Sequence, residues 1–125
     1  MCRVTLLGVP EDLARDLTLV LLAERHQVNR KRFIQELGRW PNSNAVFISG
    51  DDPDFRAVIR LVRQDWPDLP VIVVTRLPET AHWLDALEAG ANDYCGAPFE
   101  RIQVRCLLNA VLRSQQPLLS QISSR

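Results

Sequence analysis

Short apolar runs alternate along this chain with longer segments in which apolar residues return every three or four positions. Continuous apolar runs at residues 3–7, 45–48 and 70–75 are typical of buried strands, because a strand covered on both faces needs no polar positions. Two weaker strands are predicted at residues 27–29 and 92–95. The pattern therefore indicates five strands.

A segment with helical spacing follows each of these strands. Glu11 and Asp12 begin the first helix, since acidic side chains complement the positive end of the helix dipole, and Gly90 ends the fourth. The predicted helices cover residues 11–26, 31–40, 55–66, 79–89 and 99–113.

Five strands alternating with five helices predict an α/β fold with a doubly wound parallel sheet, in which right-handed crossovers place helices on both faces. In such sheets the functional crevice lies beyond the carboxyl ends of the strands. We expect one domain at residues 1–114, followed at 115–125 by a polar tail or the start of a linker. The strand ends to inspect are residues 7–10, 49–53, 75–78 and 95–98.

Composition and charge exclude several classes of protein. The chain carries 15 acidic and 15 basic side chains, so it lacks the positive charge that neutralises nucleic-acid phosphates, and we expect no direct nucleic-acid binding. No apolar run approaches the roughly 18 residues that span a bilayer, which argues for a cytoplasmic protein with no membrane contact. The 3 cysteines are scattered, so they predict no disulfide framework.

Two stretches resemble the receiver (CheY-like) domain of bacterial two-component response regulators. The strand at 70–75 and the sequence AGANDYCGAPF at 89–99 follow that family's order and spacing, except for one lysine. Residues 45–49, with Pro53 four positions on, match its third strand, its phospho-acceptor position and the proline that follows. The resemblance covers residues 3–114 and implies a flavodoxin-like (βα)5 fold with a five-stranded parallel sheet.

The resemblance also locates the positions that carry phosphoryl chemistry in that family. Ser49 stands at the position of the acceptor aspartate, Leu7 and Gly8 at the magnesium-binding acidic pair, and Ala97 at the lysine that contacts the phosphoryl oxygens. Transfer of a phosphoryl group to a carboxylate needs a divalent cation and a fixed positive group to offset the gathered charge. The resemblance therefore implies a degenerate receiver, and we expect neither a magnesium ion nor another cofactor.

Three further positions keep the family's residues. Thr75 matches the switch hydroxyl at the end of the fourth strand, and Tyr94 matches the aromatic side chain that moves inward or outward with activation. The alternative is that Thr75 caps a loop and Tyr94 packs on the sheet edge. The resemblance also implies a cis peptide bond before Pro98.

An acidic run after the third strand leaves two interpretations open. Asp51 or Asp52 is a displaced phospho-acceptor or part of a metal site, or the run with Asp54 is the solvated chemistry of a turn.

We therefore expect a non-enzymatic pseudo-receiver that regulates a protein partner or an output domain without phosphorylation. The helix at 99–113 carries apolar residues around most of its circumference. This pattern favours a homodimer through that helix, the helix at 79–89 and the strand at 92–95, or a helix covered by Leu118 and Leu119. The rivals are a conventional receiver that uses Asp51 or Asp52, and a small-molecule-binding flavodoxin-like domain, which the lack of a Gly-rich loop disfavours.

Overall fold

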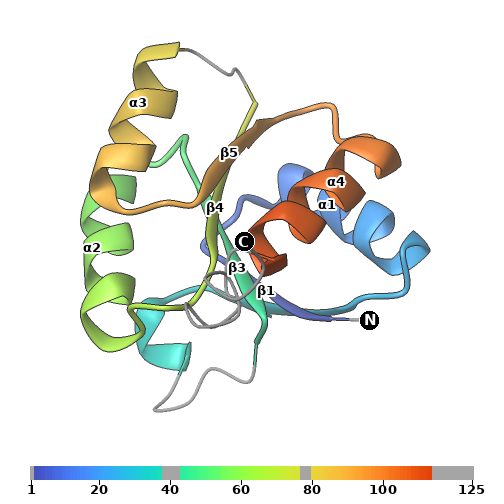
Figure 1. Cartoon of the computed structure of the whole chain (residues 1–125), viewed down its shortest axis with the longest axis horizontal. Helices are drawn as coiled ribbons and strands as arrows, with labels where there is room; N and C mark the ends of the chain where they lie inside the picture. Colours follow the sequence, from blue (N-terminus) through green and yellow to red (C-terminus); the bar gives the residue numbers. More distant parts are fainter. Residues whose placement is uncertain (1, 38–42, 77–79, 114–125) are drawn as a thin grey trace, which may run out of the picture.

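The computed structural model describes residues 2–37, 43–76 and 80–113, so the tail expected at 115–125 lies outside the described residues. Its five strands form one parallel sheet in the order β2-β1-β3-β4-β5 (Figure 1). The strands are β1 (Arg3–Leu7), β2 (Gln27–Lys31), β3 (Ala45–Ser49), β4 (Val71–Thr75) and β5 (Asp93–Gly96). The helices are α1 (Glu11–Ala23), α2 (Phe55–Asp65), α3 (Thr80–Ala89) and α4 (Arg101–Arg113), with a short 3₁₀ helix η1 (Ile34–Leu37).

Helices cover both faces of the sheet (Figure 1). On one face α1 and α4 pack over a core that includes Leu17 and Phe47, and on the other α2 and α3 pack over a core that includes Ile59 and Val73. β3 and β4 are buried at every position, which explains their unbroken apolar sequences. The predicted doubly wound α/β fold is confirmed. In the described ranges, no helix is long and apolar enough to cross a membrane.

The helix predicted at residues 31–40 is wrong. β2 instead continues to Lys31 and is followed by η1, while 38–40 lie outside the described residues. The carbonyl of Lys31 accepts the N–H of Gly8 at 2.8 Å, which keeps this residue beside β1. The carboxylate of Glu36 then accepts two backbone N–H groups, at 2.6 and 2.8 Å, and fixes a tight turn. Strand pairing and this turn outweigh the helical spacing of the apolar residues.

The end of α1 also differs from its prediction. The helix stops at Ala23 instead of residue 26, because Arg25 adopts a left-handed φ of 66° that a right-handed helix cannot continue. The other strands and helices lie close to their predicted positions.

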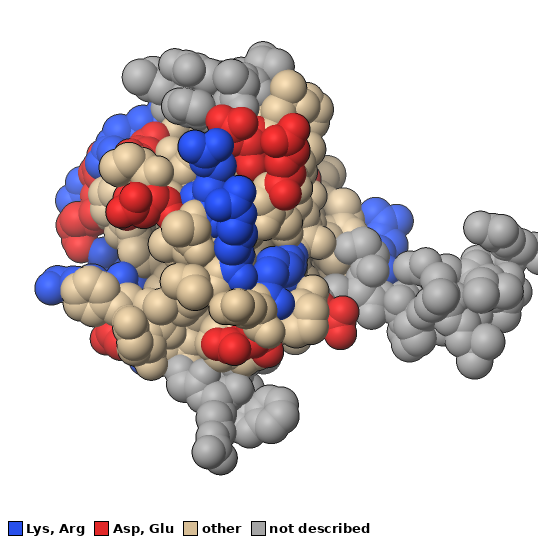
Figure 2. All heavy atoms as spheres, turned by 90° about the vertical axis from the view of Figure 1, so that its left-hand side faces the viewer, with Lys and Arg blue, Asp and Glu red and all other residues tan. Residues whose placement is uncertain are grey.

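Arg63 of α2 supports the edge of the sheet opposite the candidate site. Its guanidinium donates to the Gly90 carbonyl at 2.8 Å and to Asn92 Oδ1 at 2.5 Å, between α3 and β5. It also donates to the carbonyls of residues 66, 67 and 69, between α2 and β4. Burial lowers the pKa of Arg63. On the side of the molecule that carries α2 and α3, basic side chains gather in a stripe (Figure 2).

The three cysteines are free thiols. Cys95 is buried in the core, and this burial raises the pKa of its thiol to about 11, so it stays protonated near neutral pH. Cys106 is exposed on α4.

Candidate functional site

The carboxyl ends of the strands meet at one edge of the sheet, where the sequence places the candidate site. The ladder pairs Leu7 with Ile48 and Ser49 with Val74, so the acidic-pair positions lie beside the acceptor position. Ser49 is 2 % exposed and Thr75 is 1 % exposed. Both hydroxyls therefore belong to the floor of the site.

Asp51 reaches across the end of β4. Its Oδ1 accepts the hydroxyl proton of Thr75, and its Oδ2 accepts the backbone N–H of Arg76 at 3.1 Å. The loop can approach β4 this closely because Gly50 has no side chain. A Cβ at Gly50 would lie 2.6 Å from Cγ1 of Val73. The glycine thus brings the Asp51 carboxylate to Thr75.

Arg76 joins this carboxylate to the first helix. Its Nη1 lies 3.2 Å from Oδ2 of Asp51, and its Nε donates to Oδ2 of Asp12 at 2.8 Å, with a second bond from Nη2 to the other Asp12 oxygen. The hydrogen bond from Arg76 lowers the pKa of Asp12, and the same bond raises the pKa of Arg76. One guanidinium therefore bridges the end of β4, the β3–α2 loop and the start of α1.

Asp51 and Asp52 in the acidic run differ in their contacts, so the two interpretations that the sequence left open apply to different residues. Asp52 Oδ1 accepts the N–H of Asp54 at 2.8 Å, which is ordinary turn chemistry. Asp51 instead turns inward, and its side chain is only 26 % exposed. Phosphoryl acceptance by either residue stays a hypothesis.

The residues at the acidic-pair positions do not fit a magnesium ion. Leu7 is 3 % exposed and packs in the core beneath α2 and α3, and Gly8, with a φ of 64°, has no side chain. The carboxylate of Asp12 is already bound by Arg76. Within the ranges that the structure describes, no group of three or more His, Cys, Asp and Glu side chains is arranged to hold a metal ion. Independence from magnesium stays a prediction.

The end of β5 carries the remaining family positions. Ala97 stands at the lysine position, its N–H donates to the Thr75 carbonyl at 2.8 Å, and the Ala97–Pro98 peptide bond is cis, as the resemblance predicts. The Tyr94 ring packs against the core beneath α2 and α3 and lies beside Gly50. Its buried hydroxyl has no hydrogen-bond partner among the described residues.

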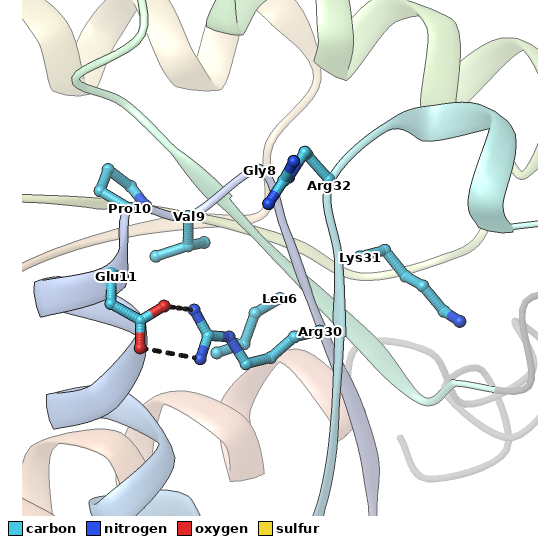
Figure 3. A pocket seen from close by; sticks show the side chains of 8 residues that line it. All are labelled: Leu6, Gly8, Val9, Pro10, Glu11, Arg30, Lys31 and Arg32. Carbon is cyan, nitrogen blue, oxygen red and sulfur yellow. Dashed lines mark hydrogen bonds and ion pairs between the residues drawn. The ribbon is translucent and has the colours of Figure 1, made fainter.

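Two cavities open beside the end of β1. The larger, of about 550 Å³, lies between β1, β2 and the start of α1 (Figure 3). Arg30 and Glu11 form an ion pair of 2.5 Å along it, Lys31 points away, and the Arg32 guanidinium turns toward Gly8. The second cavity, of about 460 Å³, lies between the ends of β1 and β3, and Arg32 lines it as well.

The ion pairs of Arg76 are the part of the site that sequence reasoning missed. Its partner Asp12 lies 64 residues away, and the sequence assigns Asp12 only to the start of a helix. The available signal is an arginine directly after Thr75, in a chain with a single lysine.

Comparisons with known proteins identify sequence relatives. No family model matches the chain. Over 78 residues it is 35% identical to the transcriptional regulatory protein VxrB of Vibrio cholerae serotype O1, covering 60% of this chain and 31% of the relative. Over 84 residues it is 31% identical to the transcriptional regulatory protein PhoP of Escherichia coli strain K12, covering 67% of this chain and 38% of the relative. The chain therefore spans about a third of the length of these curated relatives.

Solved structures share the fold. The beryllofluoride-activated receiver domain of NtrC4 matches with a TM-score of 0.77 at 18% identity, covering 91% of this chain and 98% of that chain. A response regulator from Thermotoga maritima matches with a TM-score of 0.77 at 19% identity, covering 89% and 97%. These likenesses confirm the flavodoxin-like receiver fold.

Proposed function

We propose that this chain, a receiver domain of the response-regulator family, passes on signals through protein contacts and without an aspartyl phosphate. The observation that carries the proposal is the hydrogen bond from the Thr75 hydroxyl to Asp51. Thr75 stands at the family's switch position, so a negative group of the chain itself already engages the switch. The domain would have no enzymatic activity of its own.

The residues at the acceptor site favour this proposal over phosphoryl chemistry. The Ser49 hydroxyl is a weak nucleophile and is buried at the end of β3, where its oxygen accepts the Asp51 N–H at 3.3 Å. Leu7 and Gly8 offer no side-chain oxygen to a cation, and Ala97 offers no positive charge. Charge gathered during phosphoryl transfer would therefore lack the compensation that such a reaction needs.

Arg76 helps to hold the Asp51 carboxylate next to Thr75, because it contacts both Asp51 and Asp12. It places a positive group 3.2 Å from the Asp51 carboxylate and is itself tied to Asp12 at 2.8 Å. These contacts restrict where the Asp51 side chain can lie, so that it stays within reach of Thr75.

A conventional receiver that accepts phosphate on Asp51 or Asp52 is the alternative function. The position of Asp51 favours it, because the Thr75 hydroxyl and the Arg76 guanidinium are groups that can contact phosphoryl oxygens. This alternative predicts magnesium binding and a response to mimics of an aspartyl phosphate.

A backbone amide NMR titration with magnesium and beryllofluoride, a stable mimic of the aspartyl phosphate, separates the two functions. The proposal expects the peaks of Ser49, Thr75 and Tyr94 to keep their positions. A change that starts at Asp51 or Asp52 and spreads to Tyr94 would overturn it in favour of the conventional receiver.

Two substitutions in the same loop test the engaged switch directly. Asp51→Ala removes the carboxylate that accepts from Thr75, so we expect the peaks of Thr75 and Tyr94 to shift without any added ligand. Asp52→Ala is the matched control and should perturb only its own turn. If the Thr75 peak has the same position in wild type and Asp51→Ala, Asp51 does not hold the switch.

The signal would pass to a protein partner or an output domain. The relatives are named as transcriptional regulators and are about twice as long as this chain, which supports an output in transcription. Exposed apolar side chains support a homodimer through α3, β5 and α4: Trp83 is 42% exposed, Leu84 50% and Ile102 69%. A monomer at every concentration in analytical ultracentrifugation would remove the homodimer from the proposal.

A further inference from the structure

The cavity between the ends of β1 and β3 has the location and size of a ligand site. Strand order reverses between these two strands, and open parallel sheets bind ligands in the crevice at such a point. Its volume of about 460 Å³ falls within the range of about 300–1,000 Å³ that is usual for small-molecule pockets. Most of its lining is apolar, from Leu7, Phe33, Ile34, Ile48, Phe55 and Val58.

The floor of this cavity is rigid and its rim is exposed. Leu7, Ile48 and Phe55 are 3%, 2% and 6% exposed, so they are fixed by the core. Phe33, in the turn held by Glu36, is 60% exposed. An apolar ligand between floor and rim would remove this aromatic surface from water, which is favourable.

Two polar groups at the cavity are available to a negatively charged ligand group. The Ser49 oxygen accepts an N–H from Asp51, but no described residue accepts the proton of its hydroxyl. Arg32 forms no ion pair within the described part of the chain, and its guanidinium turns toward Gly8 at the end of β1 (Figure 3). A carboxylate accepts hydrogen bonds from a guanidinium and from a hydroxyl, so both groups suit such a ligand.

The remaining charged group limits how much negative charge the ligand can carry. Asp52 also lines the cavity, and its carboxylate would repel a second anionic group. The loop after β1 lacks the run of glycines that surrounds a polyphosphate. Nucleotides are therefore poor candidates, whereas a single carboxylate on an apolar body fits the lining.

We propose that this crevice binds a small monocarboxylic acid with an aromatic or branched aliphatic body. The carboxylate accepts from Arg32 and Ser49, and the body packs on Leu7, Ile48 and Phe55. This inference goes beyond the proposed function, because it gives the domain a chemical input. The site includes Ser49, whose oxygen bonds the N–H of Asp51, so an occupant lies next to the residue that engages the switch.

An NMR titration with phenylpropanoate and isocaproate tests the proposal, with the uncharged phenylpropanamide as the matched ligand control. We expect saturable shifts at residues 7–8, 32–35 and 48–49, and roughly tenfold weaker binding of the amide. Arg32→Gln should weaken binding of the acids roughly tenfold, and Ser49→Ala several-fold. Arg60→Gln, an exposed arginine of α2 outside the cavity, should bind like wild type.

Three results would overturn the inference. One is the lack of saturable shifts for both acids up to about 10 mM, a limit below which even weak sites are detected. Another is equal affinity of wild type and Arg32→Gln. The third is binding of phenylalanine but not of phenylpropanoate, which would assign the site to a zwitterion held by Asp52. None of these results bears on magnesium or beryllofluoride, so the two proposals can fail separately.

Discussion

The two halves of the sheet's carboxyl edge differ in their chemistry. At the end of β4, Asp51, Thr75 and Arg76 form a polar network in which each side chain has a partner from another segment. At the ends of β1 and β3, Leu7 and Ser49 line an apolar cavity. The same ladder of strands supports both halves.

The residues that fix the fold are separate from the residues that give each half of the edge its chemistry. The ladder and the buried faces of β3 and β4 set the positions of the strand ends. The side chains at those ends can therefore differ between the halves, with apolar residues in one and the contacts of Asp51, Thr75 and Arg76 in the other. Substitutions that move polar groups between the halves test this separation.

The largest effect is expected from a charge placed in the apolar half. Ser49→Asp puts a carboxyl at a site that is 2 % exposed, where burial raises its pKa above the unfolded value of about 3.9. The charge-dependent part of the cost is therefore absent below that pH, grows as the pH rises from the unfolded to the folded pKa, and is constant above the folded pKa. We expect a loss of about 2–4 kcal/mol in the free energy of unfolding near neutral pH, measured by urea denaturation across the pH range.

Ser49→Asn is the control for this substitution, since it has the same size without the charge. Its cost should be smaller and independent of pH. A Ser49→Asp variant as stable as wild type near neutral pH would show that water or a cation reaches this half of the edge.

A smaller effect of opposite sign is expected at Tyr94 of β5, whose ring lies beside Gly50. Tyr94→Phe removes a buried hydroxyl without a partner among the described residues, so it should raise the free energy of unfolding by about 1 kcal/mol. Thr18→Val, which removes the other buried hydroxyl of this kind, is the matched control on α1. Chemical denaturation measures both, and destabilisation by Tyr94→Phe would mean that its hydroxyl is bonded.

The smallest effect is expected in the free energy of unfolding at acidic pH, in the plot of this free energy against pH. Because Arg76 lowers the pKa of Asp12, this pair stabilises the fold above the unfolded pKa, and the contribution is lost as the pH falls through the folded value. Arg76→Gln should therefore flatten the curve in this window and raise the pKa of the Asp12 carboxyl, which carbon NMR follows.

The control for this pH effect lies on the α1–α4 side. Arg105 and Arg101 lower the pKa of Glu24 to about 2, so its contribution is lost between the unfolded value of 4.5 and about 2. Glu24→Gln should also weaken the dependence of the free energy of unfolding on acidic pH, and it should leave the titration of Asp12 unchanged. An Asp12 pKa that is equal in wild type and Arg76→Gln would contradict the bridging role of Arg76.

Much of the fold follows from local sequence. The unbroken apolar runs of β3 and β4 predict strands because every position of these strands is buried. The helix wrongly predicted at 31–40 failed because Lys31 pairs with β1 and Glu36 bonds the backbone, and neither contact can be read from periodicity.

The candidate site was predicted only where it repeats a family motif. The interest in Ser49 and Thr75 and the cis bond before Pro98 come from the resemblance to the receiver family. The inward turn of Asp51 depends on the lack of a side chain at Gly50, and the Arg76–Asp12 pair joins segments that meet only in the folded sheet. Contacts of this kind between distant segments leave no spacing signal.

Arg63 has a consequence for how the domain opens. One guanidinium bonds the segment before β4 and the segment before β5, and Asn92 Oδ1, which it also contacts, accepts the N–H of Val71 at 2.8 Å. These segments cannot detach one at a time without breaking shared bonds, so this end of the sheet opens as one cooperative unit. The crevice lies at the other end of the strands, and its loops can rearrange while that unit stays closed.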